Sequence, residues 1–216
     1  MTKAETESVD NPLLFEIKNF MAKGMPEAVD LVLKPKDICM VYGVSGSGKS
    51  QFFKALADLI EHQGSAYVQQ QALEKVCPET WRAQVMYFSA ESAWWEDAIE
   101  LHFETVPSAE QLQKIGLDNT LLKANPDSLS SGEKQRFALL RGLQYQPKVL
   151  LLDEITANLD PASEKLVETM VLEFVQQQNA AAMWISHNPE QTARMATKTL
   201  KFSKSRVESA FGRIQL

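Results

Sequence analysis

The chain has 216 residues, of which 44% are hydrophobic and 23% charged, and its formal net charge at pH 7 is −6. This is the composition of a globular protein, so it excludes a collagen, a coiled-coil rod and a disordered chain. The acidic balance also argues against a nucleic-acid binder, which would need a basic face.

Residues 1–12 are expected to form a loose leader. Partial alternation of apolar and polar residues then predicts half-buried strands at 13–20 and 29–33. The continuous apolar run 38–42 predicts a strand covered on both faces. A glycine-rich loop follows, and a helix is predicted after it from apolar residues spaced by three and four: Phe52, Phe53, Leu56, Leu59 and Ile60.

The middle of the chain has weaker signals. Residues 85–88 are predicted to form a short strand, and 91–128 weak helices that are broken by Pro107, Gly116 and Pro126. Ser130 and Glu133 stand three apart, as a capping box requires. They predict the start of a helix that runs to about Tyr145.

The last part of the chain alternates strands with helices. Strands are predicted at 149–152, 181–186 and 199–202. Asp160-Pro161 and Asn188-Pro189 each place a capping side chain before a proline, which predicts two helix starts. Strands that alternate with helices indicate an α/β protein with a mostly parallel core sheet and flanking helices.

No stretch reaches the ~18 apolar residues of a membrane helix, and residues 1–12 lack the apolar centre of a signal peptide. Cys39 and Cys77 are the only cysteines. We therefore expect two reduced thiols rather than a disulfide framework or a metal cluster. Together these features favour a cytoplasmic protein.

The glycine-rich loop, residues 43–50 (GVSGSGKS), has the spacing GxxxxGK[ST] and lies between a predicted buried strand and a predicted helix. Its backbone N–H groups and the helix N-terminus predict a nucleotide phosphate site. Lys49 is expected to reach the β- and γ-phosphates, and Ser50 Oγ to bind Mg²⁺. The candidate nucleotide-binding residues here are Gly43, Ser45, Gly46, Ser47, Gly48, Lys49, Ser50 and Gln51.

Two carboxylates, Asp153 and Glu154, follow the apolar run 149–152. A carboxylate at such a strand end can hold Mg²⁺, directly or through water, opposite Ser50. We assign this role to Asp153. Glu154 is the next residue, so its side chain is expected to point the other way and to polarise an attacking water.

Three more segments resemble motifs of the ABC ATPases. The LSGGQ signature of that family is similar to Leu129-Ser130-Ser131-Gly132-Glu133, its D-loop to Ala157-Asn158-Leu159-Asp160, and its switch histidine to Ile185-Ser186-His187. The motifs stand in the family's order and span most of the chain. The resemblance therefore implies a P-loop NTPase fold of ABC type and an ATPase activity that uses ATP and Mg²⁺.

The resemblance also implies a homodimer that forms on ATP binding, with two ATP molecules between head-to-tail subunits. Glu154 would be the catalytic base, and Lys49 and His187 would contact the γ-phosphate. Ser130 and Gly132 would touch the ATP of the other subunit, and Asp160 would reach across the dimer. The chain would then consist of the leader and one nucleotide-binding domain, 13–216, whose parts are a core with an antiparallel β lobe (13–90 and 146–216) and a small helical subdomain (91–145).

Phe20 is our candidate for the aromatic side chain that stacks on adenine, and the alternative is a core strand residue. His62 and His102 lack the context of His187, so we interpret them as surface or packing residues.

The sequence departs from the family pattern at several positions. Ser131 and Glu133 replace glycine and glutamine of the signature. The larger departure is Ala90, which stands where the family has the Q-loop glutamine that touches Mg²⁺ and water, although the neighbouring Glu91 offers an oxygen ligand. Trp94-Trp95 follow in a stretch that faces the membrane subunit in the family, and either both pack inside or one is an exposed anchor.

Within the family, residues 143–156 and 174–187 are most similar to the ATP-binding subunit of Fet-type (YbbL-like) iron exporters. This resemblance implies an ATPase at the inner face of the cell membrane that powers a separate permease, through which alone it meets the membrane, and it suggests metal export. Ala90 and the short helical region leave open a soluble regulator or assembly factor without a permease, and a nucleotide-binding module that hydrolyses poorly. A P-loop kinase would not need the signature, the D-loop or His187.

Overall fold

The computed structural model describes residues 13–157 and 159–211. The predicted leader at 1–12 and Asn158 of the D-loop-like segment lie outside the described residues. The strands are β1 (Phe15–Ala22), β2 (Val29–Leu33), β3 (Ile38–Gly43), β4 (His62–Val68), β5 (Gln71–Ala72), β6 (Val85–Phe88), β7 (Val149–Asp153), β8 (Ala181–Ile185), β9 (Lys198–Phe202) and β10 (Val207–Phe211).

The α-helices are α1 (Lys49–Leu56), α2 (Pro78–Gln84), α3 (Ala109–Lys114), α4 (Ser131–Leu143), α5 (Pro161–Gln178) and α6 (Pro189–Met195). None of the helices among the described residues combines the length and the apolar character needed to cross a lipid bilayer.

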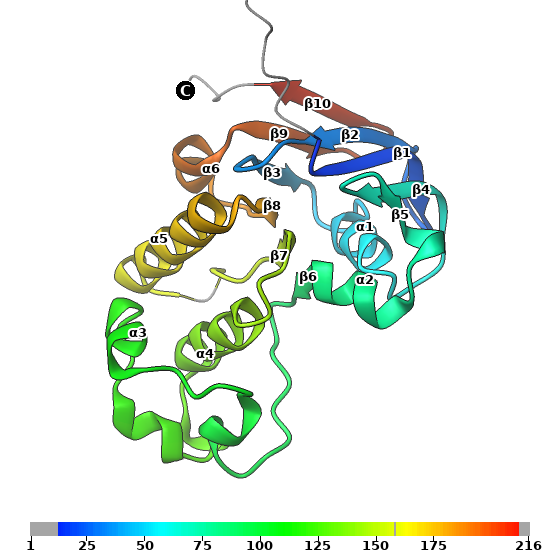
Figure 1. Cartoon of the computed structure of the whole chain (residues 1–216). Helices are drawn as coiled ribbons and strands as arrows, with labels where there is room; N and C mark the ends of the chain where they lie inside the picture. The colour runs from blue at the N-terminus through cyan, green and yellow to red at the C-terminus, as the bar shows by residue number, and fades with distance from the viewer. Residues whose placement is uncertain (1–12, 158, 212–216) are drawn as a thin grey trace, which may run out of the picture.

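The strands form two sheets (Figure 1). The main sheet has the order β10-β9-β3-β8-β7-β6, and all its pairs are parallel except β10 with β9. The second sheet, β2-β1-β4-β5, is antiparallel. The α/β expectation, with a mostly parallel core sheet and an antiparallel β lobe, is confirmed.

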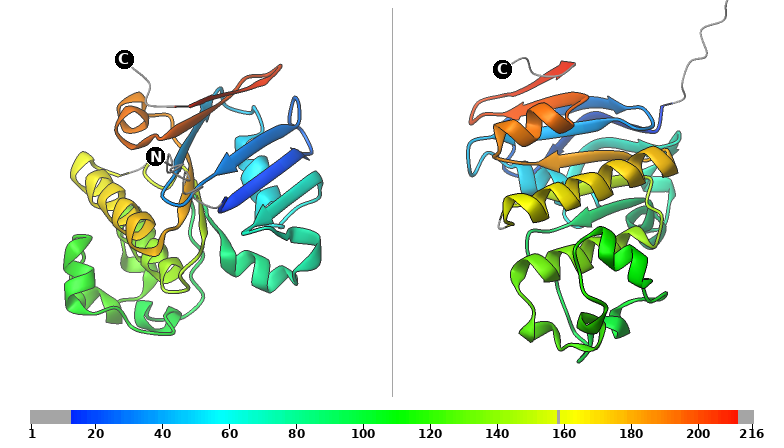
Figure 2. Two further views of the ribbon diagram at one scale, coloured as in Figure 1. Left: turned by 45° about the horizontal axis from the view of Figure 1, so that its top comes forward. Right: turned by 90° about the vertical axis from the view of Figure 1, so that its left-hand side faces the viewer.

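Alternate residues of the central strands point to opposite faces of the main sheet, which separates two apolar cores. Val149 and Leu151 belong to the core that α1 shares with the antiparallel sheet, so α1 lies between the two sheets. Leu150 and Leu152 belong to the core beneath α4, α5 and α6. The phosphate-loop helix α1 and the signature helix α4 therefore cover opposite faces of the main sheet (Figures 1 and 2).

A third apolar core holds together the region between β6 and α4, which lies below the main sheet in Figure 1. It includes Ile99, Leu112 and Phe137. Only Ala109–Lys114 forms an α-helix here, and the other helical turns are of the 3₁₀ type at 99–102, 119–123 and 126–128. The predicted break at Pro126 is confirmed: residues 124 and 125 are extended between the turns 119–123 and 126–128, because the residue before a proline disfavours helical geometry, and Pro126 itself begins the last turn.

The predicted helix through Ile60 is also too long, since α1 ends at Leu56. Asp58 adopts φ 55°, and the backbone N–H groups of Asp58 and Leu59 bond to the carbonyls of Ala55 and Lys54. This is the hydrogen-bond pattern of a Schellman motif, which closes a helix. Leu59 consequently lies exposed beyond the helix end.

The strand β4 was not predicted. Its sequence HQGSAYV buries only two side chains, Ala66 and Val68, so its apolar pattern is weak. It is a strand because it pairs with β1, where Asn19 has φ 48° and the register shifts. A Cβ on Gly64 would lie 2.2 Å from the carbonyl oxygen of Asn19, so the close approach of the two strands requires glycine there.

Candidate functional site

The phosphate loop, residues 43–50, connects β3 to α1. Gly43, Gly46 and Gly48 all have positive φ. A Cβ on Gly43 would lie 1.9 Å from the carbonyl oxygen of Phe202 in β9, so the loop can leave the sheet here only with glycine. Ser47 Oγ donates to the carbonyl of Val44 at 2.7 Å and closes the curl of the loop.

Lys49 is folded back beneath this loop. Its Nζ donates to the carbonyl oxygens of Gly43 and Val44, both at 3.0 Å. Burial lowers the pKa of Lys49, and the carboxylates of Glu154 and Asp153 partly oppose that effect. The Lys49 ammonium group is shielded from water and lies near the amides of the loop. It is therefore well placed to exchange its carbonyl partners for phosphate oxygens.

Asp153 ends β7 and is 5% exposed. Ser50 Oγ donates to its Oδ1 at 3.1 Å, and the hydroxyl of Tyr87 in β6 donates to its Oδ2 at 2.7 Å. Burial raises the pKa of Tyr87, and the hydrogen bond and charge of Asp153 raise it further. The two strands that carry Tyr87 and Asp153 are parallel neighbours in the main sheet.

The pair formed by Ser50 and Asp153 fits a magnesium ion that also binds phosphate. Neighbouring ligands of an octahedral Mg²⁺ with bonds of about 2.0–2.1 Å lie about 3 Å apart, and the two oxygens here are 3.1 Å apart. No group of three or more His, Cys, Asp or Glu side chains within residues 13–157 and 159–211 could hold a metal ion. Phosphate oxygens and water would have to complete the coordination.

Glu154 and His187 meet at the carboxyl ends of β7 and β8. Glu154 Oε1 lies 3.0 Å from His187 Nε2, and both side chains are substantially exposed. Glu154 has φ 53°, a left-handed conformation that costs a non-glycine residue about 1–3 kcal/mol. A cavity of about 390 Å³ separates the loop of His187 from Gly43 and Val44 of the phosphate loop.

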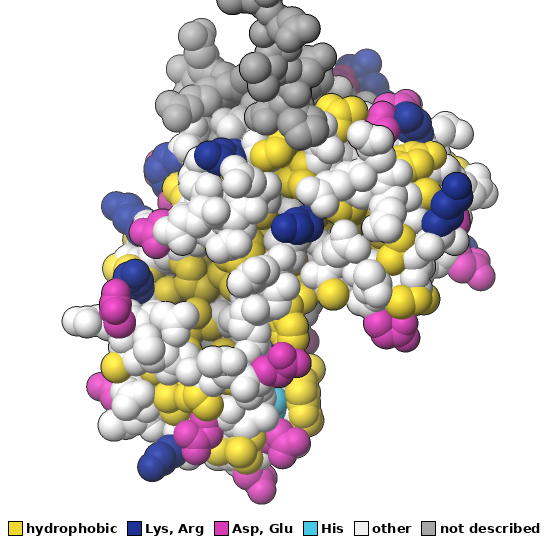
Figure 3. Space-filling view, in the orientation of Figure 1, with side chains coloured by type: hydrophobic (Ala, Val, Ile, Leu, Met, Phe, Trp, Pro, Cys, Tyr) yellow, Lys and Arg dark blue, Asp and Glu magenta, His cyan; other side chains and the backbone are white. Residues whose placement is uncertain are grey.

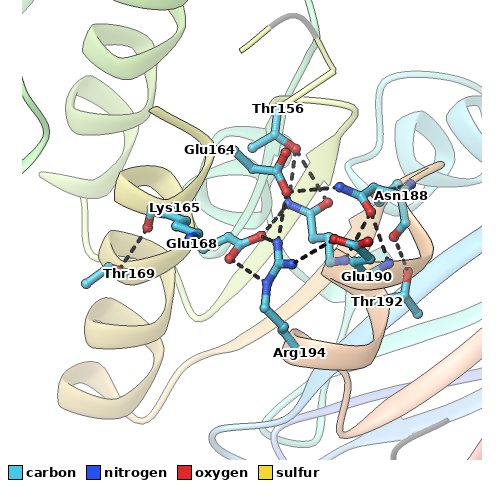
Figure 4. A network of polar contacts seen from close by, with 11 residues as sticks. Thr156, Glu164, Lys165, Glu168, Thr169, Asn188, Glu190, Thr192 and Arg194 are labelled. Atoms are coloured by element: carbon cyan, nitrogen blue, oxygen red, sulfur yellow. Dashed lines mark hydrogen bonds and ion pairs between the residues drawn. The ribbon is translucent and has the colours of Figure 1, made fainter. Parts of the chain in front are cut away.

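A buried polar network supports the segments that follow Glu154 and His187 (Figure 4). Gln191 is fully buried in α6, and its Nε2 donates to Thr156 at 3.2 Å and to Glu168 at 3.1 Å. Arg194 of α6 pairs with Glu168 at 2.7 Å and with Glu164 at 3.0 Å. These contacts connect the loop after the acidic strand end to α5 and α6.

Asn188, next to His187, is part of the same network. Its Oδ1 accepts from the backbone N–H of Glu190 and caps α6, as predicted, and its Nδ2 donates to Glu164 at 3.2 Å. The backbone on both sides of the contact between Glu154 and His187 is thus tied to α5.

The signature-like segment begins α4. Ser130 and Glu133 form the predicted capping box, and the Ser130 hydroxyl also donates to the Glu133 carboxylate at 2.6 Å. This hydrogen bond lowers the pKa of Glu133, which stays charged. A Cβ on Gly132 would approach Leu159 of the D-loop-like segment to 3.1 Å. The two segments therefore pack closely.

Asp160 caps α5, as predicted, and its Oδ1 accepts from the backbone N–H groups of Ala162 and Ser163, both at 3.0 Å. Its side chain is therefore committed within its own subunit in this structure. Arg136 of α4 donates to Ser163 Oγ at 2.7 Å and joins the two helices.

Phe20 does not form an adenine platform. It is fully buried, packs edge-on against Phe52 at a centroid distance of 6.1 Å, and stacks on His62 at 4.7 Å. The residue before it, Asn19, has φ 48° at the irregularity in β1, so the chain turns Phe20 inward. The proposed role in adenine stacking is wrong for this structure, and the alternative of a core strand residue holds. His62 is a packing residue, as predicted.

Trp94 and Trp95, on the segment after β6, form a cluster with His102 of the 3₁₀ turn 99–102 and Arg141 of α4. The space-filling view shows hydrophobic side chains at the surface of this lower part of the molecule (Figure 3). The Arg141 guanidinium lies 4.5 Å from the Trp94 ring and 5.0 Å from the Trp95 ring. His102, a buried packing residue as predicted, accepts at Nε2 from the backbone N–H groups of Trp95 and Glu96, both at 2.9 Å.

The two tryptophans of this cluster differ in exposure. Trp94 is partly buried and its Nε1 donates to Ser92 Oγ at 2.9 Å, whereas Trp95 is 67% exposed. The neighbouring Ala90 and Glu91 are also exposed, so neither packs into the core.

Comparison with known proteins matches residues 27–157 to a family model described as "ABC transporter". The probable iron export ATP-binding protein FetA of Escherichia coli is 33% identical over 76% of this chain and 78% of its own length. The phosphate import ATP-binding protein PstB of Aeropyrum pernix is 27% identical over 86% of this chain and 83% of its own length.

Among solved structures, CbiO1 from Clostridium perfringens, a part of the ABC transporter complex CbiONQ, superposes with a TM-score of 0.76. The superposition covers 94% of this chain and 89% of that chain at 17% identity. This likeness concerns the fold.

Proposed function

The chain belongs to the ABC transporter family, whose ATP-binding proteins are ATPases, and we propose that it is the ATP-hydrolysing subunit that powers a separate membrane permease. One observation carries this proposal. Ser50, next to the buried Lys49 of the phosphate loop, donates to Asp153 at the end of β7, and Glu154 and His187 contact each other beside it. This arrangement supports the proposal, because it brings the candidate phosphate-binding, metal-binding and water-activating groups together at one edge of a parallel sheet.

In the proposed mechanism, the N–H groups of the phosphate loop hold the phosphates and Lys49 exchanges its carbonyl partners for the β- and γ-phosphate oxygens. Ser50 and Asp153 would hold Mg²⁺, which neutralises charge on the phosphates when bound. Glu154 would orient and polarise the attacking water. His187 would contact the γ-phosphate, and its hydrogen bond to Glu154 orients both side chains.

We further propose that ATP binding brings two copies of the chain together head to tail. The signature helix α4 and the phosphate-loop helix α1 cover opposite faces of the same sheet. A signature can therefore meet a phosphate loop most simply from a second subunit. Ser130 and Gly132 of the partner subunit would then face the γ-phosphate, with the positive end of α4 behind them. Asp160 would have to leave its capping role to reach across the dimer.

The permease is proposed to dock beside Trp95, on the helical subdomain that we assign to residues 91–145. An exposed tryptophan that stacks on an arginine supplies the contact area and rigidity of a binding hot spot. A cleft of about 280 Å³ opens beside it, lined among others by Phe88, Arg141 and Tyr145. Membrane association at the inner face would then depend on the permease alone. The similarity to FetA supports metal export, of iron in particular, as the transport function.

The first experiment tests the ATP-driven dimer. The variant Glu154→Gln should keep ATP bound, so with Mg-ATP it should change from monomer to dimer in light scattering coupled to size exclusion. Lys49→Ala combined with Glu154→Gln is the control and should stay monomeric. A Glu154→Gln variant that stays monomeric with Mg-ATP, with and without the membrane partner, would show that the mechanism is wrong.

The second experiment tests the partner. The tagged protein is purified from its native cells in a mild detergent, and its partners are identified by mass spectrometry. A polytopic membrane protein in near-equal amount is expected, and Trp95→Ala should lose it, whereas Leu101→Ala, an equally exposed apolar residue that does not line the cleft, should retain it.

A soluble regulator without a permease is the second candidate function. It is favoured by Ala90, which is exposed and has no polar group to relay the state of the nucleotide. Recovery of soluble partners only would support it over the transporter subunit.

A further inference from the structure

The hydroxyl of Tyr87 reaches the proposed metal ligand Asp153 from the neighbouring strand. Tyr87 lies beside Leu151 in the parallel pair β6–β7, and it packs against the core that contains Leu151. Asp153 follows Leu151 by two residues, so it projects on the same face. The long tyrosine side chain spans this offset and places its hydroxyl 2.7 Å from Asp153 Oδ2.

The two oxygens of Asp153 have different partners. Ser50 contacts Oδ1 at 3.1 Å, and Tyr87 contacts Oδ2 at 2.7 Å. Among residues 13–157 and 159–211, no other side chain is hydrogen-bonded to this carboxylate. The shorter bond therefore anchors the far oxygen, and this fixes the rotation that directs Oδ1 at Ser50. A buried ligand whose orientation is set by a second hydrogen bond is the usual means of tuning a metal site.

Ala90 has no polar side-chain atom that could orient the Asp153 carboxylate. The side chain of Ala90 is only a methyl group. The hydroxyl of the neighbouring Ser89 donates to the backbone carbonyl of Glu91. Ser89 in turn accepts the Nε2–H of Gln135 at its own carbonyl, at 3.1 Å. The side chains of Ser89 and Gln135 are thus bonded to backbone carbonyls, whereas the Tyr87 hydroxyl is bonded to the Asp153 carboxylate.

We propose that Tyr87 is a positioning residue that orients the Asp153 carboxylate for the cation bound with the nucleotide phosphates. This inference rests on the proposed function, because it needs a nucleotide-bound divalent cation at Ser50 and Asp153. The hydroxyl of Tyr87 is bonded to Asp153, so it should act on the metal-dependent part of the nucleotide affinity.

The test measures the affinity for AMP-PNP, which is not hydrolysed, by calorimetry in EDTA and in excess Mg²⁺. Tyr87→Phe removes only the hydroxyl, and Tyr67→Phe removes the same group from β4, where the ring lies under Lys18 at 5.3 Å. Losing a hydrogen bond to a charged group is expected to reduce the gain in affinity from Mg²⁺ about tenfold in Tyr87→Phe. Its affinity in EDTA, and both affinities of Tyr67→Phe, should stay within about twofold of the parent protein.

A double-mutant cycle with Asp153→Asn separates positioning from a general structural effect. If Tyr87 acts through Asp153, Tyr87→Phe should cause no further loss of Mg²⁺ dependence in the Asp153→Asn background. The affinity for manganese in the presence of AMP-PNP, measured by electron paramagnetic resonance, should fall in Tyr87→Phe and in Asp153→Asn and stay unchanged in Tyr67→Phe.

Three results would overturn the inference. They are an equal loss of affinity with and without Mg²⁺, an unchanged gain from Mg²⁺ in Tyr87→Phe, and additive losses in the cycle. All three leave the proposed function standing. If Mg²⁺ did not change the affinity of the parent protein for AMP-PNP, this result would contradict the proposed function itself and therefore also the role of Tyr87.

Discussion

Arg194 is the cation between two carboxylates of α5, and its replacement by methionine is expected to destabilise the fold. It pairs with Glu168, whose side chain is 7% exposed, and with Glu164, whose side chain is 16% exposed. Removing one partner of a fully buried pair costs about 3–5 kcal/mol. Because Arg194 is itself 40% exposed, water can replace part of this pairing, and we expect a loss of about 2 kcal/mol.

The loss should depend on pH. Burial raises the pKa of Glu164, the nearby Glu168 raises it further, and Arg194 opposes both. A carboxyl group with a raised pKa in the folded state stabilises the fold below its unfolded pKa, and this contribution disappears as the pH rises through the folded pKa. Without Arg194 the pKa of Glu164 rises further. The deficit of Arg194→Met should therefore be largest at about pH 7–8 and shrink as the pH falls toward about 5.

Urea unfolding followed by tryptophan fluorescence measures this change, and a loss of about 2 kcal/mol corresponds to about 4–8 °C in thermal midpoint for a chain of this size. Arg206→Met is the control, because Arg206 pairs with Glu208 at the surface and should change stability by less than about 0.5 kcal/mol. A deficit of Arg194→Met below that of the control, or one that grows toward low pH, would refute this account of the network.

Three further predictions follow from individual contacts. Lys49→Ala should weaken ATP binding at least about tenfold in calorimetry, because the charge that we propose to bind the phosphates is lost, whereas Lys54→Ala at the other end of α1 should leave the affinity unchanged. Glutamine in place of Ala90 should alter the ATPase rate or its stimulation by the permease, and no change in either would show that this corner does not limit turnover. Gly142→Ala should destabilise the protein by about 1–3 kcal/mol in urea unfolding although alanine favours helices, because a Cβ there would lie 2.3 Å from the ring of Phe88. A more stable Gly142→Ala variant would contradict the packing of α4 on β6.

Several parts of the structure could be predicted because their causes are local. The caps at Ser130, Asp160 and Asn188 bond to backbone N–H groups two or three residues away, so the sequence contains both partners. The buried strands 149–152 and 181–185 are continuous apolar runs, which is how strands covered on both faces are recognised. The positions of the phosphate loop, the acidic strand end and the loop of His187 could be predicted as well, because each segment directly follows one of the apolar runs.

Other features depend on partners far away in the chain. Phe20 has the aromatic character of an adenine platform, but the irregularity of β1 buries it against Phe52. Tyr87 belongs to a short apolar run without any polar signal, and its partner Asp153 is on another strand. Gln191 in α6 is buried because it joins Thr156 to Glu168.

The sequence by itself determined the type of fold, the family and the residues of the phosphate loop and acidic strand end, because these depend on periodicity and on motifs of fixed spacing. Only the tertiary structure decided which side chains support Asp153 and the loop of His187, and which aromatic residue is buried. Such contacts require strands and helices to come side by side, and their geometry depends on register, twist and a single left-handed residue such as Asn19.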